Sequence, residues 1–579
     1  MDFMKTYESW LASEALSPAE KAELEAIRGD AKEIESRFFE QLSFGTAGLR
    51  GTMGVGLYRM NVHVIRHATQ AFAEVILAEG AEAVARGVAV CYDCRNNSDI
   101  FAREAACVLA GNGIPVRLFA ALRPTPMVSF AVREYGCIAG INVTASHNPK
   151  EYNGYKVYWE DGAQLPPVHA DEVARKMREL DVFACVKSMD YETALAEGKI
   201  VLMGEETDEA FLANVMAQVN DKAVVEKVAD DFKMVFTPFH GTGYQLIPEA
   251  LKRLGMKHVI CVPEQMVIDG DFPTVVSPNP ENPEGFYLAV EIAKKEGADF
   301  ILGSDPDADR VGIMVNTGNG EFKVISGNQI GILLTDYIIG AWKRAGKMPA
   351  NGVILKSLVS TEMARTIAEA NGLTCYDTFT GFKFLAQKKD QLEESGEGTV
   401  LLAFEESNGY MFGSMFGSFV RDKDAVTASL ILTEMAAWYA DQGMTLYDAL
   451  MGLYKKYGFY AEKTLNLVMP GLDGLKKMAQ LMADLREKPP VEIAGVAVVQ
   501  QKDYKDGSVV NVATGEKTTM ELTDSNVLRY EMADGTSLIV RPSGTEPKVK
   551  VYVLTSAEDQ AACDAKVAKY AAWADTLKG

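Results

Sequence analysis

Short apolar runs alternate with helix-forming segments along most of the chain, and this alternation restricts the fold more than any other feature. Apolar runs bounded by turn residues predict buried strands. The predicted strands form three series, at 88–92, 115–120 and 137–143, at 234–236, 258–262 and 300–303, and at 353–355 and 399–404. Strands that alternate with helices form βαβ units with parallel sheets. The sequence therefore predicts an α/β protein with three consecutive α/β mixed-sheet domains.

The C-terminal part of the chain differs from these three series. From about Gly458 the segments become shorter, with strands predicted at 538–540 and 549–553 and a closing helix from about Ala557 to Leu577. Runs of strands followed by a helix are typical of an α+β domain. We therefore expect a separate C-terminal α+β domain, with all the domains arranged around a central cleft.

At the N-terminus, Ser17-Pro18-Ala19-Glu20 forms a capping box with proline at the first helical position, which predicts a helix towards Arg28. Two or three such helices precede the first strand series. The expected domain limits are 1–205, 206–324, 325–457 and 458–579.

The balance of charge restricts the partners. The chain has 80 acidic and 58 basic residues, which gives a net charge of −22. So acidic a protein is repelled by nucleic acid and by anionic membrane surfaces, and neither is expected as a partner. No apolar run approaches the length of a membrane span, and the N-terminus has no apolar signal core, so we expect a cytoplasmic protein. An anionic small substrate stays possible, because distant charges are screened by salt.

Two groups of residues resemble metal ligands. Cys91 and Cys94 form a single CxxC pair among eight scattered cysteines, which we interpret as reduced thiols near a strand end. His63 and His67 lie four residues apart on a predicted helix over 61–79, but no third ligand lies nearby. We expect neither pair to bind a metal.

Each strand series contains a strand that ends in a polar loop: Ser146-His147-Asn148, Asp305 to Arg310, and Glu405 to Gly409. Open α/β sheets bind ligands at the carboxyl ends of their strands. If the series share one topology, the three loops lie at the same edge and face one cleft. Serine is also a common turn residue, so Ser146 alone does not establish a nucleophile.

The second loop favours a divalent cation. Asp305, Asp307 and Asp309 alternate with small residues, and carboxylates at this spacing converge on a hard ion such as Mg²⁺ or Ca²⁺. An EF-hand is excluded, because Arg310 and Asn316 occupy the places of its glycine and its last glutamate. A nucleophilic aspartate of the haloacid-dehalogenase type would leave the other loops unexplained.

Two further loops carry groups that suit a phosphorylated sugar. Arg541, Ser543, Thr545 and Lys548 offer cations and hydroxyls in a glycine-containing turn, which suits a phosphate dianion, although a basic hairpin tip would look similar. Glu405 and Ser407 combine an acceptor with a donor, as vicinal sugar hydroxyls require, but this pair is the least specific.

These loops together predict phosphoryl transfer. A reachable serine, a divalent cation and a phosphate clamp are its usual parts. No Walker A motif or kinase glycine-rich loop is present, so a nucleotide donor is not expected. The serine itself must then carry the phosphoryl group.

One more segment, Phe44 to Gly51, is rich in glycine. We expect it to hold neither helix nor strand and to be a loop that carries one cation, Arg50.

The residues that carry this chemistry resemble the motifs of the α-D-phosphohexomutase superfamily, in its α-phosphoglucomutase and phosphopentomutase branch. The resemblance covers essentially the whole chain, in the order that the family has. The segments that carry it are 44–51, 144–156, 236–243, 278–285, 305–310, 380–383, 404–409 and 541–548.

The resemblance implies a role for each matching residue. Ser146 would be the phosphoserine, supported by His147, and with Asp305, Asp307 and Asp309 it would hold Mg²⁺. Lys156 would be the general base, with its pKa lowered by cations such as Arg310, which would also steady the transferring group. The implied substrate-binding residues are Arg50, Lys383, Glu405, Ser407, Arg541, Ser543, Gly544, Thr545 and Lys548.

The activity implied by the resemblance is interconversion of glucose 1-phosphate and glucose 6-phosphate through a phosphoserine enzyme, with glucose 1,6-bisphosphate as intermediate and activator. The last domain would act as a lid that excludes water. Phosphomannomutase, phosphopentomutase, bisphosphate synthase or sugar-phosphate phosphatase activity, and a non-catalytic sugar-phosphate-binding protein, stay as alternatives. The chain departs from some relatives in reading Asn408-Gly409-Tyr410 where they place a histidine, so the second acid or base is unassigned. We expect a monomer or a homodimer.

Overall fold

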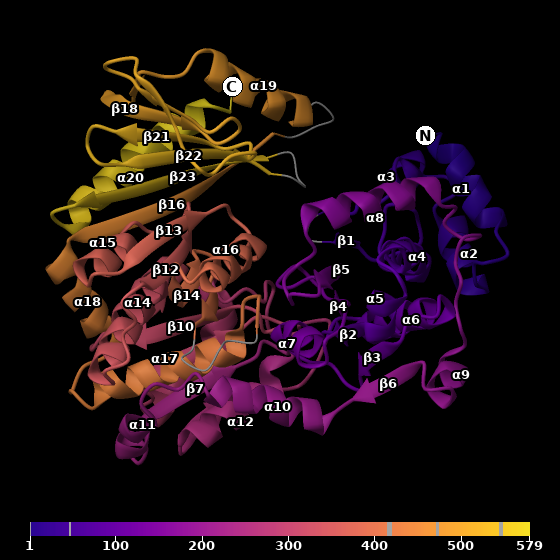
Figure 1. The fold of residues 1–579 in the computed structure, drawn as a ribbon, viewed down its shortest axis with the longest axis horizontal. Helices are drawn as coiled ribbons and strands as arrows, with labels where there is room; N and C mark the ends of the chain where they lie inside the picture. Colours follow the sequence, from indigo (N-terminus) through magenta and orange to yellow (C-terminus); the bar gives the residue numbers. More distant parts are fainter. Residues whose placement is uncertain (1, 46–47, 414–419, 470–473, 544–547, 579) are drawn as a thin grey trace. The chain divides into compact units, whose positions relative to one another are not determined.

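The computed structural model describes residues 2–45, 48–413, 420–469, 474–543 and 548–578. The chain divides into two compact units. Figure 1 shows its helices and strands with their labels. The first unit holds Met1–Ile325 and Asn408–Thr445, and the second holds Ser326–Ser407 and Leu446–Gly579.

The first unit contains a six-stranded mixed sheet with the order β1-β5-β4-β2-β3-β6. Its strands are β1 (Leu49–Thr52), β2 (Val88–Tyr92), β3 (Val116–Phe119), β4 (Ala139–Val143), β5 (Tyr152–Trp159) and β6 (Ile200–Met203). β2 pairs in parallel with β3 and β4, whereas β5 is antiparallel to β1 and β4. The predicted parallel strand that leads to Ser146 is therefore β4, at the centre of the sheet.

Helices pack around this sheet, and α6 and α7 contact β2 and β4. The helices of this part are α1 (Phe3–Ala12), α2 (Pro18–Ala26), α3 (Ala31–Phe38), α4 (Val62–Ala78), α5 (Ala81–Arg86), α6 (Ser98–Gly111), α7 (Pro126–Glu134), α8 (Pro167–Glu179) and α9 (Tyr191–Ala196). The predicted capping box at Ser17 and Glu20 is confirmed at the start of α2.

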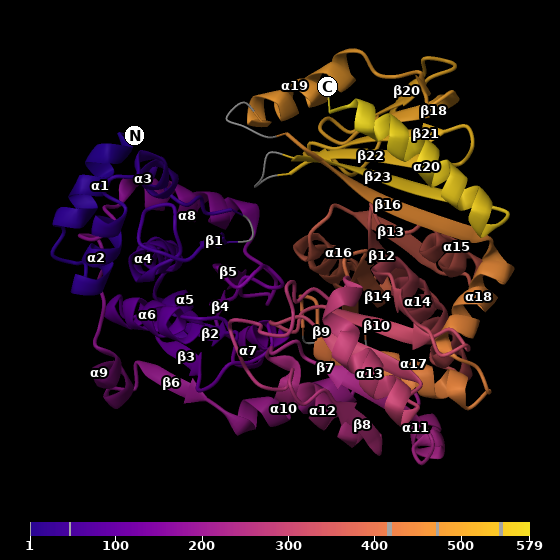
Figure 2. The ribbon, with the colours of Figure 1, turned by 180° about the vertical axis from the view of Figure 1, so that it is seen from behind.

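A second sheet of the first unit has the order β11-β10-β9-β7-β8. Its strands are β7 (Lys233–Thr237), β8 (His258–Cys261), β9 (Phe300–Ser304), β10 (Val311–Asn316) and β11 (Phe322–Ile325), and β15 (Gly409–Phe412) also lies in this unit. The helices are α10 (Glu205–Met216), α11 (Lys222–Val228), α12 (Gly243–Leu254), η1 (Pro283–Phe286), α13 (Tyr287–Glu296) and α17 (Ala425–Ala440). α13 packs on β7 and β9 (Figure 2). The loop after β9 therefore follows a buried strand that is covered by a helix.

The second unit contains a parallel group, in which β12 pairs with β13 and β14, and a large antiparallel sheet. The parallel group and its helices are α14 (Gly327–Arg344), β12 (Gly352–Ser357), α15 (Met363–Ala370), β13 (Thr374–Thr378), α16 (Phe382–Ser395), β14 (Thr399–Glu405) and α18 (Leu446–Tyr457). The fold class predicted from the sequence, with α/β domains followed by an α+β domain, is confirmed.

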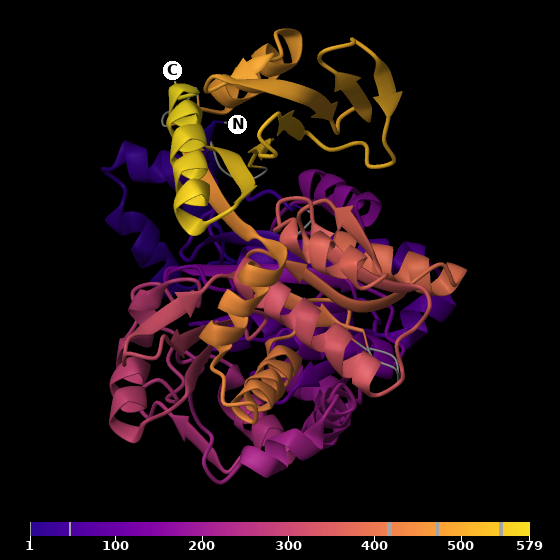
Figure 3. The ribbon, with the colours of Figure 1, turned by 90° about the vertical axis from the view of Figure 1, so that its left-hand side faces the viewer.

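The antiparallel sheet has the order β16-β23-β22-β21-β18-β19-β20, and β17 pairs with β18. Its elements are β16 (Phe459–Val468), α19 (Gly474–Glu487), β17 (Glu492–Ile493), β18 (Val496–Asp503), β19 (Ser508–Asn511), β20 (Lys517–Thr519), β21 (Leu528–Met532), β22 (Ser537–Pro542), β23 (Lys548–Ala557) and α20 (Gln560–Thr576). α20 lies along β16 and β23 (Figure 3). It begins later than the predicted Ala557, because β23 continues to that residue and Asp559 caps the helix.

The expectation that 44–51 holds no strand is wrong. Leu49 to Thr52 form β1, which pairs with β5 through Arg50 and Gly154. The glycines allow this close pairing: Gly48 has a φ of +81°, and a Cβ there would lie 1.8 Å from the carbonyl oxygen of Tyr155. Glycine density here reflects the close approach of two backbones and not the absence of a strand.

His63 and His67 each form a polar contact with a neighbouring segment, and the cysteines form no disulfide bonds within the described residues. The ring of His63 lies 2.9 Å from Glu20, and the ring of His67 lies 3.1 Å from the carbonyl oxygen of Leu180. The eight cysteines are all free thiols. Within the described residues, none of the helices combines the length and the apolarity needed to cross a lipid bilayer.

Asp424, the N-cap of α17, is buried, and its carboxylate accepts hydrogen bonds from the first turn of that helix. Its Oδ1 accepts hydrogen bonds from the backbone N–H groups of Val426 and Thr427, at 2.9 and 3.0 Å. Burial raises the pKa of Asp424 to about 6, although these hydrogen bonds oppose the rise. The folded protein therefore keeps a proton that the unfolded chain releases at lower pH, and the stability gained from it is lost as the pH rises through about 6.

Replacing Asp424 with asparagine keeps the acceptor and removes the charge. We expect Asp424→Asn to raise the free energy of unfolding by about 1–3 kcal/mol near pH 8 and to change it little near pH 4. Urea unfolding at both pH values measures the difference. Asp559→Asn is the control, because it makes the same replacement at the exposed N-cap of α20. An equal effect of Asp424→Asn at both pH values would contradict the prediction.

Candidate active site

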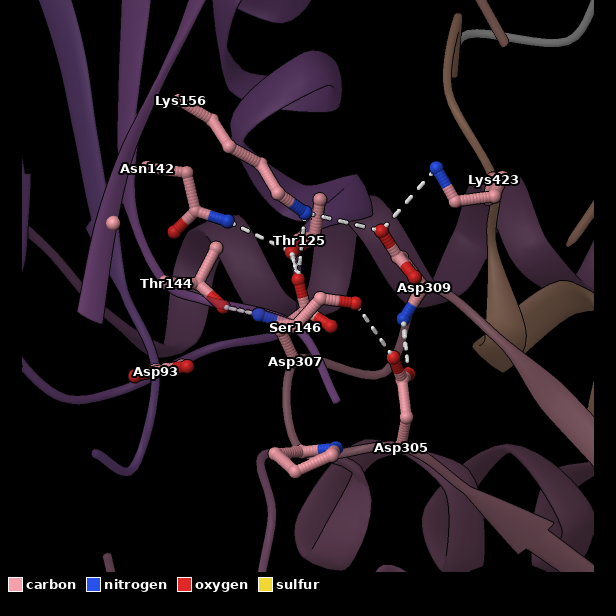
Figure 4. A network of polar contacts seen from close by, with 12 residues as sticks. Asp93, Thr125, Asn142, Thr144, Ser146, Lys156, Asp305, Asp307, Asp309 and Lys423 are labelled. Carbon is pink, nitrogen blue, oxygen red and sulfur yellow. Dashed lines mark hydrogen bonds and ion pairs between the residues drawn. The ribbon is translucent and has the colours of Figure 1, made fainter. Parts of the chain in front are cut away.

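Ser146 lies three residues beyond the end of β4, with its side chain turned towards the loop that follows β9 (Figure 4). Its Oγ donates a hydrogen bond of 3.0 Å to Oδ2 of Asp305 and lies 3.2 Å from Nδ1 of His147. The residue is only 3% exposed and has a φ of 53°, in the left-handed region that residues other than glycine rarely adopt. The strand end thus holds the hydroxyl in one strained orientation next to the aspartates.

The loop after β9 gathers the three aspartates. One ligand oxygen from each of Asp305, Asp307 and Asp309 lies within 4.8 Å of the others, and all three residues are buried. The loop is tightly wound because Oδ1 of Asp305 accepts hydrogen bonds from the N–H groups of Asp309 and Arg310, at 3.1 and 2.9 Å. The predicted convergence of these carboxylates is confirmed in the geometry of the loop.

The donor set fits a hard divalent cation. All the ligand atoms are carboxylate oxygens, as Mg²⁺ prefers. Among the described residues, neither Oδ1 of Asp307 nor Oδ1 of Asp309 has a hydrogen-bond partner, although both are buried. Buried acceptors without donors are costly, and a cation would satisfy them.

The pKa values of the three aspartates shift in different directions. Burial and the neighbouring carboxylates of Asp307 and Asp309 hold the pKa of Asp305 well above its usual range. Burial also acts to raise the pKa of Asp307, but Lys156 and the hydrogen bonds to this carboxylate outweigh it. At Asp309, burial and Asp307 act upward, and Lys156, Lys423 and Arg310 together outweigh them, so both pKa values are lowered. Two of the three carboxylates are therefore ionised next to a lysine.

Lys156, on β5, is the partner of these carboxylates. Its Nζ lies 2.8 Å from Oδ2 of Asp307 and 3.1 Å from Oδ2 of Asp309. Burial lowers the pKa of Lys156, but Asp307 and Asp309 raise it by more, so the net shift is upward. The expectation of a lowered pKa for Lys156 is thus wrong. The sequence does not show that this lysine lies between Asp307 and Asp309.

The other cations predicted for this loop cluster lie close by. Nη1 of Arg310 is 3.2 Å from Glu281, and its Nε is 3.8 Å from Asp309. Nη1 of Arg50 donates a 3.1 Å hydrogen bond to the side chain of Asn148, in the serine loop. Burial, Arg310 and Arg50 hold the pKa of His147 well below its usual range, so the imidazole beside Ser146 is neutral.

Lys423 and Thr125, which were not predicted from the sequence, both contact the aspartates. Nζ of Lys423 lies 3.3 Å from Oδ2 of Asp309. Thr125 donates from its hydroxyl to Oδ2 of Asp307 at 2.8 Å and from its backbone N–H to the carbonyl oxygen of Asp307 at 2.7 Å. A charged run just before an apolar helix, Arg421 to Asp424, was the available signal for Lys423.

The second unit holds the residues predicted to contact the sugar and its second phosphate. Glu405 ends β14, and its Oε1 accepts a 2.6 Å hydrogen bond from the backbone N–H of Gly381. Lys383 lies in α16, with its Nζ 5.0 Å from the centre of the Phe384 ring. Ser407 follows β14 in the same unit. The predicted sugar loop thus lies beside the start of α16.

The predicted phosphate clamp lies at the end of the β22–β23 hairpin. Arg541 is on β22, and the N–H of Ser543 donates a 2.8 Å hydrogen bond to the carbonyl oxygen of Lys548. Burial raises the pKa of Tyr552 on β23; Glu406 and Glu405 act in the same direction and Arg541 in the opposite one. Charges of both the clamp strand and the sugar loop therefore act on this phenol. Gly544 and Thr545 lie outside the described residues.

The chain is similar to known proteins over most of its length. Family models described as phosphoglucomutase/phosphomannomutase match the chain in four segments: α/β/α domain I at 41–182, domain II at 209–318, domain III at 326–457 and the C-terminal domain at 466–569. Similar curated proteins include the phosphoglucomutases of Staphylococcus saprophyticus, with 32% identity over 91% of this chain and 93% of the relative, and of Staphylococcus aureus, with 34% identity over 91% and 92%.

Solved structures share the fold. A phosphoglucomutase/phosphomannomutase family protein from Burkholderia thailandensis matches with a TM-score of 0.64 and 20% identity, over 93% of this chain and 98% of the other. The open form of parafusin, a phosphoglucomutase from Paramecium, matches with a TM-score of 0.66 and 18% identity, over 93% and 95%.

Proposed function

Since this chain belongs to the phosphoglucomutase/phosphomannomutase family, we propose that it is a phosphoglucomutase. It would interconvert glucose 1-phosphate and glucose 6-phosphate through a phosphoserine and a glucose 1,6-bisphosphate intermediate. The observation that carries the proposal is the position of Ser146 Oγ, 3.0 Å from Asp305 in the buried triad. The names of the curated relatives support glucose phosphates as substrates.

In the forward direction, phospho-Ser146 gives its phosphoryl group to O6 of glucose 1-phosphate. The bond from phosphorus to Oγ breaks, the bond to O6 forms, and the hydroxyl proton passes to a base. The bisphosphate then turns round, and Ser146 recovers a phosphoryl group from O1. Both halves are in-line transfers, which depend mainly on positioning and on neutralising charge.

The proton acceptor that we propose is Lys156, whose Nζ lies next to the triad. It has to be neutral to accept a proton, whereas Asp307 and Asp309 favour its charged form. Arg310 lies beside the same triad, 3.8 Å from Asp309, and would steady the transferring group. His147 supports Ser146 as a neutral ring at 3.2 Å.

Mg²⁺ is the cofactor that we propose for Asp305, Asp307 and Asp309, together with an oxygen on Ser146. When bound, it would draw negative charge from the phosphoryl group and from the carboxylates. Glucose 1,6-bisphosphate is proposed as activator, because an enzyme that has lost its phosphoryl group can regain it from either phosphate.

We assign the sugar hydroxyls to Glu405 and Ser407 and a cleft cation to Lys383. Arg50 is proposed, like Lys383, as a cleft cation, and the phosphate that does not react is assigned to Arg541, Ser543, Gly544, Thr545 and Lys548. This clamp must accept the phosphate at either end of the sugar, and cationic and hydroxyl donors can bind either phosphate.

Kinetics on three substrates test the proposal. Glucose 1-phosphate, mannose 1-phosphate and ribose 1-phosphate are compared with Mg²⁺ and glucose 1,6-bisphosphate present. We expect kcat/KM to be highest for glucose 1-phosphate. A preference for mannose or ribose phosphate would reassign the substrate, release of inorganic phosphate would indicate a phosphatase, and accumulation of bisphosphate would indicate a synthase. No turnover of any substrate would reject the proposal.

A cytoplasmic location is also proposed, and the eight free thiols support a reducing compartment. The oligomeric state, a monomer or a homodimer, stays a prediction.

A further inference from the structure

We propose that Arg95 is a positioning residue that holds the Ser146 loop in its strained conformation for phosphoryl transfer. The inference rests on the function proposed above, and it goes beyond the residues that carry that reaction. Arg95 lies just after β2, the strand next to β4, and its side chain has no exposed surface. No substrate can therefore reach its guanidinium group.

The guanidinium group donates to four carbonyl oxygens of the serine loop. Nη2 donates to Ser146 at 2.6 Å and to Asn148 at 2.5 Å, and Nη1 donates to Pro149 at 2.9 Å and to Tyr152 at 3.0 Å. Arginine is the only side chain that can bind four carbonyl oxygens in this way, because its planar guanidinium group carries five N–H donors. One side chain thus ties together the whole turn from Ser146 to Tyr152.

An ion pair and an aromatic ring also contact the guanidinium group of Arg95. Nε lies 3.3 Å from Oδ2 of Asp93, and the centre of the Phe272 ring lies 5.2 Å from the guanidinium carbon. Oδ1 of Asp93 accepts hydrogen bonds from the backbone N–H of Arg95 at 2.9 Å and from the hydroxyl of Ser98 at 2.7 Å, and Oγ1 of Thr144 accepts from the N–H of Ser146 at 2.9 Å. Asp93 therefore helps to hold Arg95 in place through both its backbone N–H and its guanidinium group.

This arrangement explains how a strained serine is maintained. Residues other than glycine keep a left-handed backbone only when their surroundings overdetermine it. Ser146 has its N–H fixed by Thr144 and its carbonyl oxygen fixed by Arg95. Losing the second contact would let the loop relax and move Oγ away from Asp305. A displacement of about 1 Å at a reacting atom can cost about 100-fold in rate.

Arg95→Lys is the test, because it keeps the charge but loses the fork. We expect kcat for glucose 1-phosphate to fall about 10- to 100-fold with KM within about threefold of wild type, since the substrate is held elsewhere. Hydrogen exchange of the amides from 144 to 152 should become faster, while exchange in α4 stays as in wild type. The exchange measurement needs no turnover, so it is independent of the proposed function.

Arg86→Lys is the matched control. Arg86 also bridges carbonyl oxygens next to β4, those of Gly136 and Cys137, but at the opposite end of the strand. The kcat of Arg86→Lys and the hydrogen exchange of its amides from 144 to 152 should equal those of wild type. Failure of the wild-type enzyme to turn over glucose 1-phosphate would count against the proposed function and not against Arg95.

The inference is overturned if folded Arg95→Lys keeps wild-type kcat and wild-type exchange of the loop. It is also overturned if kcat/KM falls only through KM. If Arg95→Lys does not fold, Phe272→Leu decides, because it removes the ring beneath the guanidinium and leaves Arg95 in place. We expect kcat of Phe272→Leu to fall about three- to tenfold with faster loop exchange, and unchanged values of both would overturn the inference.

Discussion

Ser146→Ala is expected to lower kcat by at least about 10⁴-fold, because the phosphoryl group then has no oxygen on which to be stored. The fold should survive, since the hydroxyl donates only to Asp305 and otherwise lies near His147. The assay is turnover of glucose 1-phosphate with Mg²⁺ and glucose 1,6-bisphosphate present. Binding of glucose 1-phosphate by the variant should stay within about tenfold of wild type, because the phosphate clamp is intact.

Ser429→Ala is the control for this variant. Ser429 is a buried serine of the same unit, and its hydroxyl donates only along α17, to the carbonyl oxygen of Ala425 at 2.6 Å. Its activity should equal that of wild type. A Ser146→Ala protein with turnover close to that of wild type would eliminate the phosphoserine mechanism.

Removing the divalent cation, or one of its proposed ligands, is expected to have the next largest effect. Asp307→Asn removes an ionised carboxylate whose Oδ2 accepts from Lys156 and Thr125 and whose Oδ1 has no hydrogen-bond partner among the described residues. We expect kcat/KM to fall about 10²- to 10⁴-fold and the Mg²⁺ concentration for half-maximal activity to rise. Chelation of the wild-type enzyme should abolish turnover, and added Mg²⁺ should restore it.

Asp299→Asn is the matched control, because Asp299 precedes the other end of β9 and accepts a hydrogen bond from the backbone N–H of Lys233. Its Mg²⁺ dependence should equal that of wild type. Full activity of the wild-type enzyme after exhaustive chelation would show that the triad holds no cation that the reaction needs.

Much of the fold could be predicted because its signals are local. Apolar runs such as Val88–Tyr92 and Phe300–Ser304 are strands in the structure, since a buried strand needs a continuous apolar run. The aspartate cluster was predictable for the same reason, because its three ligands lie within five residues of chain. Local pattern was enough wherever the interaction partners are neighbours in sequence.

The errors lie where partners come from distant segments. The glycines near Arg50 allow β1 to approach β5, but the sequence alone makes them indistinguishable from loop glycines. Likewise, the upward pKa shift of Lys156 depends on carboxylates about 150 residues away along the chain. Arg95, which ties the serine loop across about 50 residues, carries no local signal of that role.

The most direct test of the account is to follow the phosphoryl group itself. The enzyme is first phosphorylated with glucose 1,6-bisphosphate, and the modified residue is located by peptide mass spectrometry. The phosphoenzyme is then mixed with glucose 1-phosphate and quenched at short times. We predict that phosphate leaves Ser146 at least as fast as kcat and appears in glucose 1,6-bisphosphate. Phosphate found on another residue, or lost from Ser146 only as inorganic phosphate, would contradict it.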